Sequence, residues 1–263
     1  MIRLGGAASP GYITVFRGLV EYFGRHDLEL DWVLYSGWDT MVDAFVSGEI
    51  DLAWNGPLSY LKIKRRVEQP CKVVAMRDVD VDLVTHFITR PDSDIENIED
   101  LLEKQFAFGR RDSVETGVLA YHFLKQAGIN PRTDLESFSF YDERRDQNPS
   151  PEHDVIQRVI SGELDAGAIS QPTIERLAAS GEVAADDIRI IWSSPGFSHC
   201  CFTAQGDTDP QLAQRITDAF LSVDSADPIG KIILEGEHCG KFVPGITEGW
   251  EILEKVAVEE GLL

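Results

Sequence analysis

The sequence predicts an α/β fold with two Rossmann-like lobes joined by a hinge of two crossing segments. The first observation behind this prediction is a repeat, because residues 47–51 (SGEID) return as residues 161–165 (SGELD). An amphipathic run precedes each copy, and a proline that opens another helix-like run follows each copy, at Pro57 and Pro172. Segments that recur with their surroundings indicate duplicated structural units. The second observation is the alternation of strand-like and helix-like runs, which is typical of parallel sheets covered by helices.

In the first lobe, short apolar runs predict strands, and amphipathic runs with capping residues predict the helices between them. The expected strands cover residues 2–6, 30–35, 50–54 and 72–76. The expected helices cover residues 10–23, 40–47 and 57–67. We expect Ser9 to cap the first helix, with Pro10 in its first turn, and Asp39 or Thr40 to cap the second.

The second lobe repeats this order and then returns the chain to the first. Its expected strands cover residues 106–109, 137–141, 164–170 and 189–192, and its expected helices cover residues 113–127, 154–160 and 172–179. Extended segments at residues 82–88 and 193–203 connect the lobes, and helices at residues 210–223, 228–235 and 247–260 complete the first. We therefore expect lobe one to contain residues 1–84 and 201–263, and lobe two to contain residues 85–200.

Composition limits the classes of function. A chain of 263 residues with 43% hydrophobic content has room for two cores. The formal net charge of −21 argues against a nucleic-acid surface, which needs clustered Lys and Arg. No apolar stretch approaches the roughly 20 residues that span a bilayer. The opening residues MIRLGG lack the apolar core of a secretion signal, so we expect a cytoplasmic protein as given, or a periplasmic or extracellular one if a leader was removed.

The predicted ligand site lies beyond the carboxyl ends of the strands, where helix N-termini present N–H groups to negative charge. In the first lobe these ends carry Ser9, Tyr12, Trp38 and Asn55. In the second lobe they carry Ser113, Glu115, Thr116, His153 and Ser170. Arg77 and His199 belong to or border the crossing segments. We expect Tyr12 and Trp38 to form aromatic walls for the ligand, whereas Tyr35 and Trp54 are expected in the core.

Three segments together carry a resemblance that covers nearly the whole chain. They are residues 47–60 (SGEIDLAWNGPLSY), residues 106–109 (FAFG) leading into Asp112 and Ser113, and His153 with Asp154. The pattern resembles the phosphate/phosphonate-type (PhnD-like) solute-binding proteins of ABC transporters, which have the type II periplasmic-binding fold. The resemblance implies a cofactor-free protein that closes on a small anionic or zwitterionic ligand, as a transporter receptor or an intracellular sensor. It also implies an ABC permease as partner if the protein is exported, and we expect a monomer.

The resemblance also implies roles for individual residues. Family members that bind phosphonates carry a Ser-Thr-Ser type run at the start of the second-lobe helix, and this chain keeps Ser113 and Thr116 but inserts Glu115. His153 matches the ligand-contacting histidine of the family. A carboxylate beside a bound oxyanion repels it by about a kcal/mol or more. Three interpretations of Glu115 stay open: nearby arginines compensate for it, it holds the ammonium group of a zwitterionic ligand, or it faces solvent in the first helical turn.

An enzyme on the same scaffold is the alternative hypothesis. His199 precedes the cysteine pair Cys200 and Cys201, so a metal-dependent cytoplasmic enzyme acting through His199 stays open. The four cysteines show no zinc-type spacing, and no nucleophile–base pair can be identified. We therefore predict no metal and no catalytic residue, and we favour a binding protein.

Overall fold

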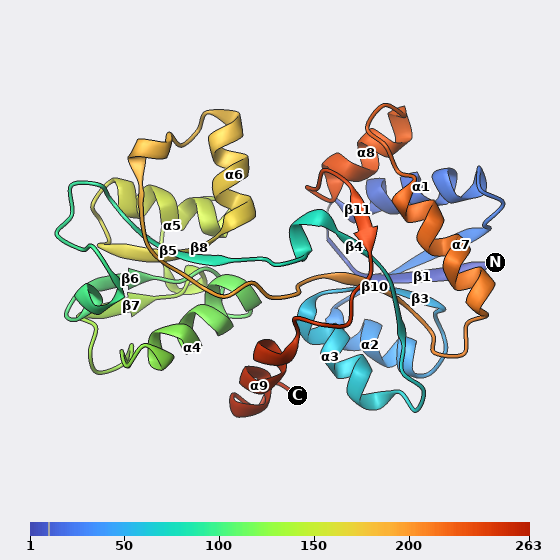
Figure 1. Cartoon of the computed structure of the whole chain (residues 1–263), viewed down its shortest axis with the longest axis horizontal. Helices are drawn as coiled ribbons and strands as arrows, with labels where there is room; N and C mark the ends of the chain where they lie inside the picture. The colour runs from blue at the N-terminus through green and yellow to red at the C-terminus, as the bar shows by residue number, and fades with distance from the viewer. Residues whose placement is uncertain (10) are drawn as a thin grey trace. The chain divides into compact units, whose positions relative to one another are not determined.

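The chain forms two compact α/β units in the computed structural model, which describes residues 1–9 and 11–263 (Figure 1). Unit 1 contains Met1–Val81 and Ser198–Leu263, and unit 2 contains Asp82–Phe197. The units divide after Val81 and after Phe197, whereas we expected lobe boundaries after residues 84 and 200. Each unit has one sheet with helices on both faces, so the α/β prediction is confirmed.

Unit 1 is built on a six-stranded sheet in the order β11-β4-β10-β3-β1-β2. The strands are β1 Ile2–Ala7, β2 Leu30–Tyr35, β3 Leu52–Asn55, β4 Lys72–Arg77, β10 Cys201–Ala204 and β11 Phe242–Pro244. Strand β1 runs parallel to β2 and β3, but β10 is antiparallel to β3 and β4, and β11 is antiparallel to β4. The expected purely parallel sheet is therefore wrong, because β10 follows a return crossing rather than a helix.

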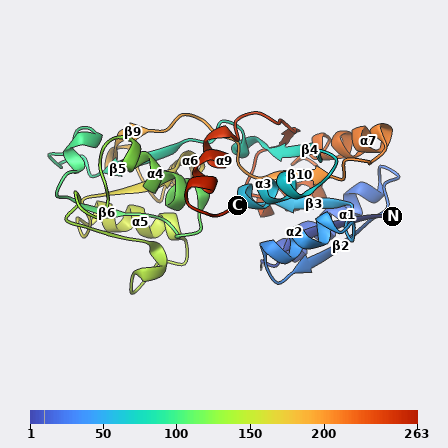
Figure 2. The same cartoon turned by 90° about the horizontal axis from the view of Figure 1, so that it is seen from below.

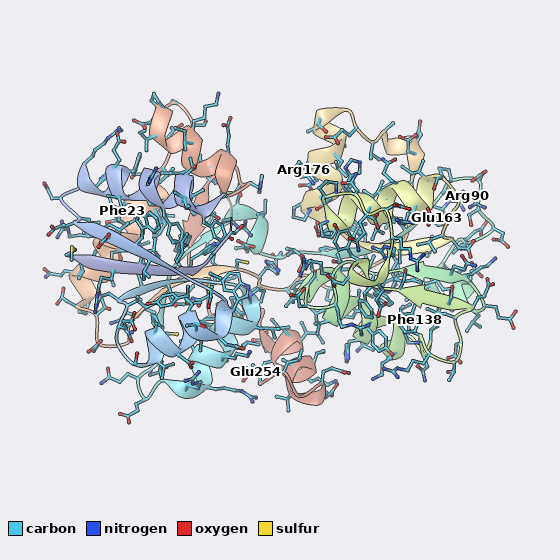
Figure 3. All side chains as sticks on the ribbon, turned by 180° about the vertical axis from the view of Figure 1, so that it is seen from behind. Phe23, Arg90, Phe138, Glu163, Arg176 and Glu254 are labelled. Atoms are coloured by element: carbon cyan, nitrogen blue, oxygen red, sulfur yellow. The ribbon has the colours of Figure 1, made fainter. Side chains whose placement is uncertain are left out.

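Helices cover both faces of this sheet (Figure 1). The helices of unit 1 are α1 Tyr12–Gly24, α2 Trp38–Val46, α3 Pro57–Arg66, α7 Pro210–Leu221, α8 Pro228–Gly236 and α9 Glu251–Glu259, with the 3₁₀ turn η1 Asp78–Asp80. Helices α1, α7 and α8 bury one face, and α2 and α3 bury the other. Phe23, labelled in Figure 3, belongs to the first face and packs edge-on against Phe220. Helix α9 packs beside α3, since Trp250 lies against Tyr60 and Glu254 pairs with Lys64.

Unit 2 has a five-stranded sheet in the order β7-β6-β8-β5-β9. The strands are β5 Thr85–Thr89, β6 Gln105–Ala107, β7 Ser137–Ser139, β8 Ala166–Ser170 and β9 Arg189–Ser193. The helices are α4 Leu119–Gln126, α5 Pro151–Ile160 and α6 Gln171–Ser180, with a π-helix η3 Val114–Val118 and the 3₁₀ turns η2 Ile98–Leu101, η4 Tyr141–Glu143 and η5 Ala185–Asp187. Helices α5 and α6 cover one face and α4 the other (Figures 1 and 2). Strand β5 is antiparallel to β8 and β9, again unlike the prediction.

The repeated segment occupies equivalent places in the two units. In each copy the glycine ends a helix in the left-handed region, with φ of 73° at Gly48 and 75° at Gly162. The Asp51 carboxylate accepts the Arg3 backbone N–H at 2.8 Å, and the Asp165 carboxylate accepts the Gln105 N–H at 2.9 Å. Each aspartate therefore fixes the start of the neighbouring parallel strand, which explains why both copies keep it.

Three predicted helix starts are wrong. Helix α1 begins at Tyr12 with Gly11 as N-cap, so Ser9 does not cap it; Pro10 lies outside the described residues. Helix α2 begins at Trp38 after Gly37 rather than at a cap on Asp39 or Thr40. Helix α5 begins at Pro151, where a missing N–H costs nothing.

Candidate functional site

The first helix of unit 2 starts with two hydroxyl groups held against each other. Ser113 is the N-cap, and its Oγ accepts the Thr116 backbone N–H at 3.3 Å and lies 2.9 Å from Thr116 Oγ1. The helix then runs through the π-turn η3 into α4, and such turns often occur at functional sites. Because a helix start leaves backbone N–H groups without intrahelical partners, hydroxyls and amides converge here.

Two glycines allow this close packing. A Cβ on Gly109 would lie 2.0 Å from Thr116 Oγ1, and a Cβ on Gly117 would lie 2.2 Å from the Arg110 carbonyl oxygen. Neither position accepts a side chain without moving the turn. The loop after β6 is therefore shaped around the side chain of Thr116, a residue that is 1% exposed.

An acidic pair lies near these hydroxyls. The Glu152 carboxylate, from the first turn of α5, accepts the Ser170 N–H at 2.8 Å and the Ser170 Oγ–H at 2.7 Å. The Thr85 hydroxyl, opposite Ser170 in the sheet, donates to the Glu115 carbonyl at 2.8 Å. Burial, and then the negative charge of Glu115, raise the pKa of Glu152.

Sequence reasoning did not select Glu152 or Thr85 as site residues. The signal for Glu152 was its place in the first turn of a helix beyond a strand end. Its inward direction depends on Ser170, which is distant in sequence, so only the fold could reveal it.

The structure does not place His153 with this group. His153 Nδ1 lies 3.7 Å from Glu182 Oε2, and its Nε2 lies 3.2 Å from Gln157 Nε2. Asp154 does not cap the helix; it is buried and accepts hydrogen bonds from Arg144 and Arg158 at 2.7 and 3.1 Å. The sequence pattern gave no sign of this ion-pair network, because Arg144 belongs to a loop before α5.

In unit 1, the predicted residues divide into an exposed set and a buried set. Ser9 is exposed, and Trp38 is 40% exposed, with its ring beside Gly56. Asn55 is fully buried at the end of β3, where its Nδ2 donates to Thr203 Oγ1 at 2.7 Å. Its Oδ1 accepts no hydrogen bond among the described residues. Trp54, expected in the core, is buried and stacks on Phe202.

Tyr12 lies at the start of α1 on the edge of the core. Its ring stacks on Phe16, with centroids 5.8 Å apart. Burial raises the pKa of Tyr12 to about 12, helped by the neighbouring Glu237 and Cys200. The nearby Trp54 indole N–H acts to lower the pKa of Tyr12. Among the described residues, Trp54 Nε1 has no hydrogen-bond partner within bonding distance and angle. Tyr12 therefore acts as a neutral phenol at physiological pH.

Arg77 and His199 meet in a buried ionic cluster instead of standing open to solvent. Arg77 donates from Nε and Nη2 to the Asp80 carboxylate at 2.6 and 2.8 Å, and from Nη1 to the Glu237 carbonyl at 2.8 Å. His199 Nδ1 lies 3.0 Å from Asp80 Oδ1. Burial would raise the pKa of Asp80, but Arg77 and then His199 hold it at about 2.

Glu237 is the second carboxylate of this cluster. Its side chain is fully buried, and neither carboxylate oxygen has a hydrogen-bond partner within residues 1–9 and 11–263. The nearest Arg77 nitrogen is 3.8 Å from Oε2. Burial raises the pKa of Glu237 to about 7, with Arg77 limiting the rise.

The cluster does not form a nucleophilic triad. The same ring nitrogen, His199 Nδ1, lies 3.0 Å from Asp80 and 3.2 Å from Cys200 Sγ. A Cys-His-Asp relay uses one ring nitrogen for the nucleophile and the other for the carboxylate. Burial also raises the pKa of the Cys200 thiol, which opposes thiolate formation. The enzyme alternative therefore gains no nucleophile from this arrangement.

Comparison with known proteins places the chain among solute receptors. The family model "ABC transporter, phosphonate, periplasmic substrate-binding protein" matches residues 12–248. A curated relative, "Probable ABC transporter phosphite binding protein PhnD1" of Prochlorococcus marinus (strain MIT 9301), is 24% identical over 242 residues, covering 88% of this chain and 78% of the relative.

Solved structures show the same fold. The structure of PhnD1 from Prochlorococcus marinus in complex with methylphosphonate matches with a TM-score of 0.72 at 19% identity, covering 100% of this chain and 98% of that one. The periplasmic aliphatic sulphonate-binding protein SsuA of Escherichia coli matches with a TM-score of 0.63 at 17% identity, covering 99% and 92%. The expected type II periplasmic-binding fold is confirmed.

In the described part of the chain, no helix is both long enough and apolar enough to cross a membrane. The family model covers most of the chain, so the resemblance inferred from the repeat and the helix-start residues is confirmed. The chain belongs to the periplasmic substrate-binding proteins of phosphonate ABC transporters.

Proposed function

We propose that this protein binds a phosphonate or a closely related oxyanion as the receptor of an ABC importer. The observation that carries the proposal is the Ser113–Thr116 hydroxyl pair at the start of the η3–α4 helix. Hydroxyls and helix-start N–H groups together favour bound oxyanions. The family and the methylphosphonate complex of the Prochlorococcus relative support the same ligand class.

The acidic pair of Glu115 and Glu152 limits the kinds of oxyanion that we propose as the ligand. Glu115 and Glu152 interact closely enough for the charge of one to raise the pKa of the other. Two carboxylates beside an oxyanion weaken the binding of a simple dianion. We propose that the ligand also carries a cation, as an aminoalkyl phosphonate does, and that Glu115 attracts its ammonium group.

A thermal-shift panel tests both levels of this proposal. Methylphosphonate and 2-aminoethylphosphonate should raise the melting temperature, the second more, while sulfate at equal ionic strength should not. Glu115→Gln should reverse the preference between the two phosphonates, and the exposed Glu136→Gln is the matched control. If no phosphonate stabilises the protein, the ligand class is wrong. If methylphosphonate raises the melting temperature of the wild type more than 2-aminoethylphosphonate does, only the proposal of a zwitterionic ligand is wrong.

Further predicted ligand contacts stay proposals. They are Ser9, Tyr12, Trp38, Asn55, Arg77, His153, Ser170 and His199. Trp38 is the most accessible to test, because its exposed ring can be removed with little loss of packing. Trp38→Ala should weaken phosphonate binding while leaving the melting temperature of the ligand-free protein within a few degrees.

We also propose that the protein acts as a monomer with an ABC permease, outside the cytoplasm. Family membership supports the permease and the compartment. Light scattering of the purified chain should give the mass of one chain, and a stable dimer would contradict the monomer. Fractionation of cells that express the natural gene tests the compartment.

A further inference from the structure

Three side chains of types that can ligate metals meet where the chain leaves and re-enters unit 1. Asp80 lies in η1, next to the last residue of the first segment of unit 1, and His199 and Cys200 follow Ser198, the first residue of the second. The His199 backbone N–H donates to the Asp80 carbonyl at 2.9 Å, which joins the two segments. The donor atoms of Asp80, His199 and Cys200 all lie within 4.8 Å of one another.

The geometry suits a bound cation. Bonds of about 2.0 to 2.3 Å from a tetrahedral Zn²⁺ place its ligand atoms about 3 to 4 Å apart. His199 Nδ1 lies 3.0 Å from Asp80 Oδ1 and 3.2 Å from Cys200 Sγ. A carboxylate oxygen, an imidazole nitrogen and a thiolate sulfur form a donor set that binds thiophilic divalent metals in preference to Mg²⁺ or Ca²⁺.

The surroundings support the same ligand set. Arg77 fixes the Asp80 carboxylate with two hydrogen bonds, as outer partners do for ligating carboxylates. Without a cation, the buried carboxylates of Asp80 and Glu237 outnumber the single guanidinium of Arg77. When Glu237 is ionised, a divalent cation and one thiolate bring the cluster to neutrality, which lowers the cost of burying its charges. The His199 side chain is 12% exposed, so an ion can reach the cluster from solvent.

We propose that Asp80, His199 and Cys200 bind Zn²⁺ or a similar thiophilic divalent cation, which clips together the two chain segments at the edge of unit 1. Coordination through Nδ1 places the imidazole proton on Nε2. Cys200 binds as the thiolate and releases its proton to solvent, so binding weakens as the pH falls. A water molecule completes the tetrahedron.

The test uses the full chain without a histidine tag, stripped with EDTA and titrated with Co²⁺. One Co²⁺ per chain should bind, with a thiolate-to-metal charge-transfer band in the near ultraviolet, and Zn²⁺ should displace it. Cys200→Ser should remove the band and weaken binding at least tenfold. Cys71→Ser, which changes another half-buried free cysteine of unit 1, should change neither.

A second measurement keeps the test decisive if Cys200→Ser folds poorly. His199→Gln should then lose the melting-temperature increase that Zn²⁺ gives the wild type, while circular dichroism confirms its fold. Absence of saturable Co²⁺ and Zn²⁺ binding by the wild type overturns the proposal. So does equal binding by the wild type and Cys200→Ser.

Discussion

At the scale of single residues, the protonation of acidic side chains depends on burial as much as on residue identity. Glu237 and Glu152 are ordinary acids in the sequence, but Glu237 is fully buried, Glu152 is partly buried, and each has a raised pKa. Neither shift could be predicted from the sequence, because the desolvating neighbours are distant along the chain. The position of Ser113 and Thr116 at a helix start could be predicted, because local pattern reveals that start.

Glu237 should make stability depend on pH. Its folded pKa of about 7 exceeds the ordinary value of 4.5, so the folded state binds the proton more tightly. The resulting stability is present below about pH 4.5 and is lost as pH rises towards 7, by about 3 kcal/mol at most. Glu237→Gln should flatten the free energy of unfolding between pH 5 and 8, measured by urea denaturation.

The exposed Glu235→Gln, in the last turn of α8 just before the C-cap Glu237, is the control and should keep the wild-type pH dependence. A slope that survives in Glu237→Gln would show that other groups cause it.

At the scale of elements, the repeat is the most predictable feature. Both copies end a helix with a left-handed glycine and start a buried strand, as their surroundings indicated. Local pattern could not reveal that β5 and β10 run antiparallel to their neighbours, since strand direction depends on where a crossing segment joins the sheet. Strand β11 was not predicted, because its three residues end in Pro244 and a proline argues against a strand.

The repeated aspartates should support the two sheets equally. Asp165→Ala removes the acceptor of the Gln105 N–H and should cost about 1 to 3 kcal/mol of unfolding free energy. Asp51→Ala should cost a similar amount, since Asp51 accepts the Arg3 N–H in the same way. Asp186→Ala, which changes an exposed turn residue, is the control. If it lowered the unfolding free energy by the same amount, the repeated aspartates would have no special role in stability.

Two helix glycines should respond in opposite directions. Gly117→Ala places a Cβ against the backbone carbonyl of Arg110, so we expect a loss of about 1 to 3 kcal/mol and weaker oxyanion binding. Gly24→Ala, in open space at the end of α1, should be neutral or stabilise by up to about 1 kcal/mol. Chemical denaturation of both variants checks this contrast, which equal stabilities would contradict.

At the scale of the whole molecule, two α/β units and a strongly acidic surface were both visible in the sequence. The repeat and the strand–helix alternation indicate the two units, because both patterns can be recognised in short stretches of sequence. The Asp80–His199 contact was invisible, because its partners are 119 positions apart and neither lies in a motif. The formal charge of −21 follows from counting residues alone.

This charge should make stability depend on salt. Repulsion among excess carboxylates opposes the compact state, and salt screens it. Raising NaCl from about 0.02 to 0.5 M should therefore raise the melting temperature by several degrees. Sucrose at equal osmolality controls for solvent exclusion, and a melting temperature that falls with NaCl would show that screened ion pairs matter more than the net repulsion.

The central claim is that Ser113 and Thr116 hold an oxyanion, and calorimetric titration with methylphosphonate tests it most directly. The wild type should bind one methylphosphonate per chain, and Ser113→Ala should bind at least tenfold more weakly. The exposed Ser137→Ala of the same unit should bind like the wild type. Equal affinity of the wild type and Ser113→Ala, or no heat of binding in any of them, would contradict the account.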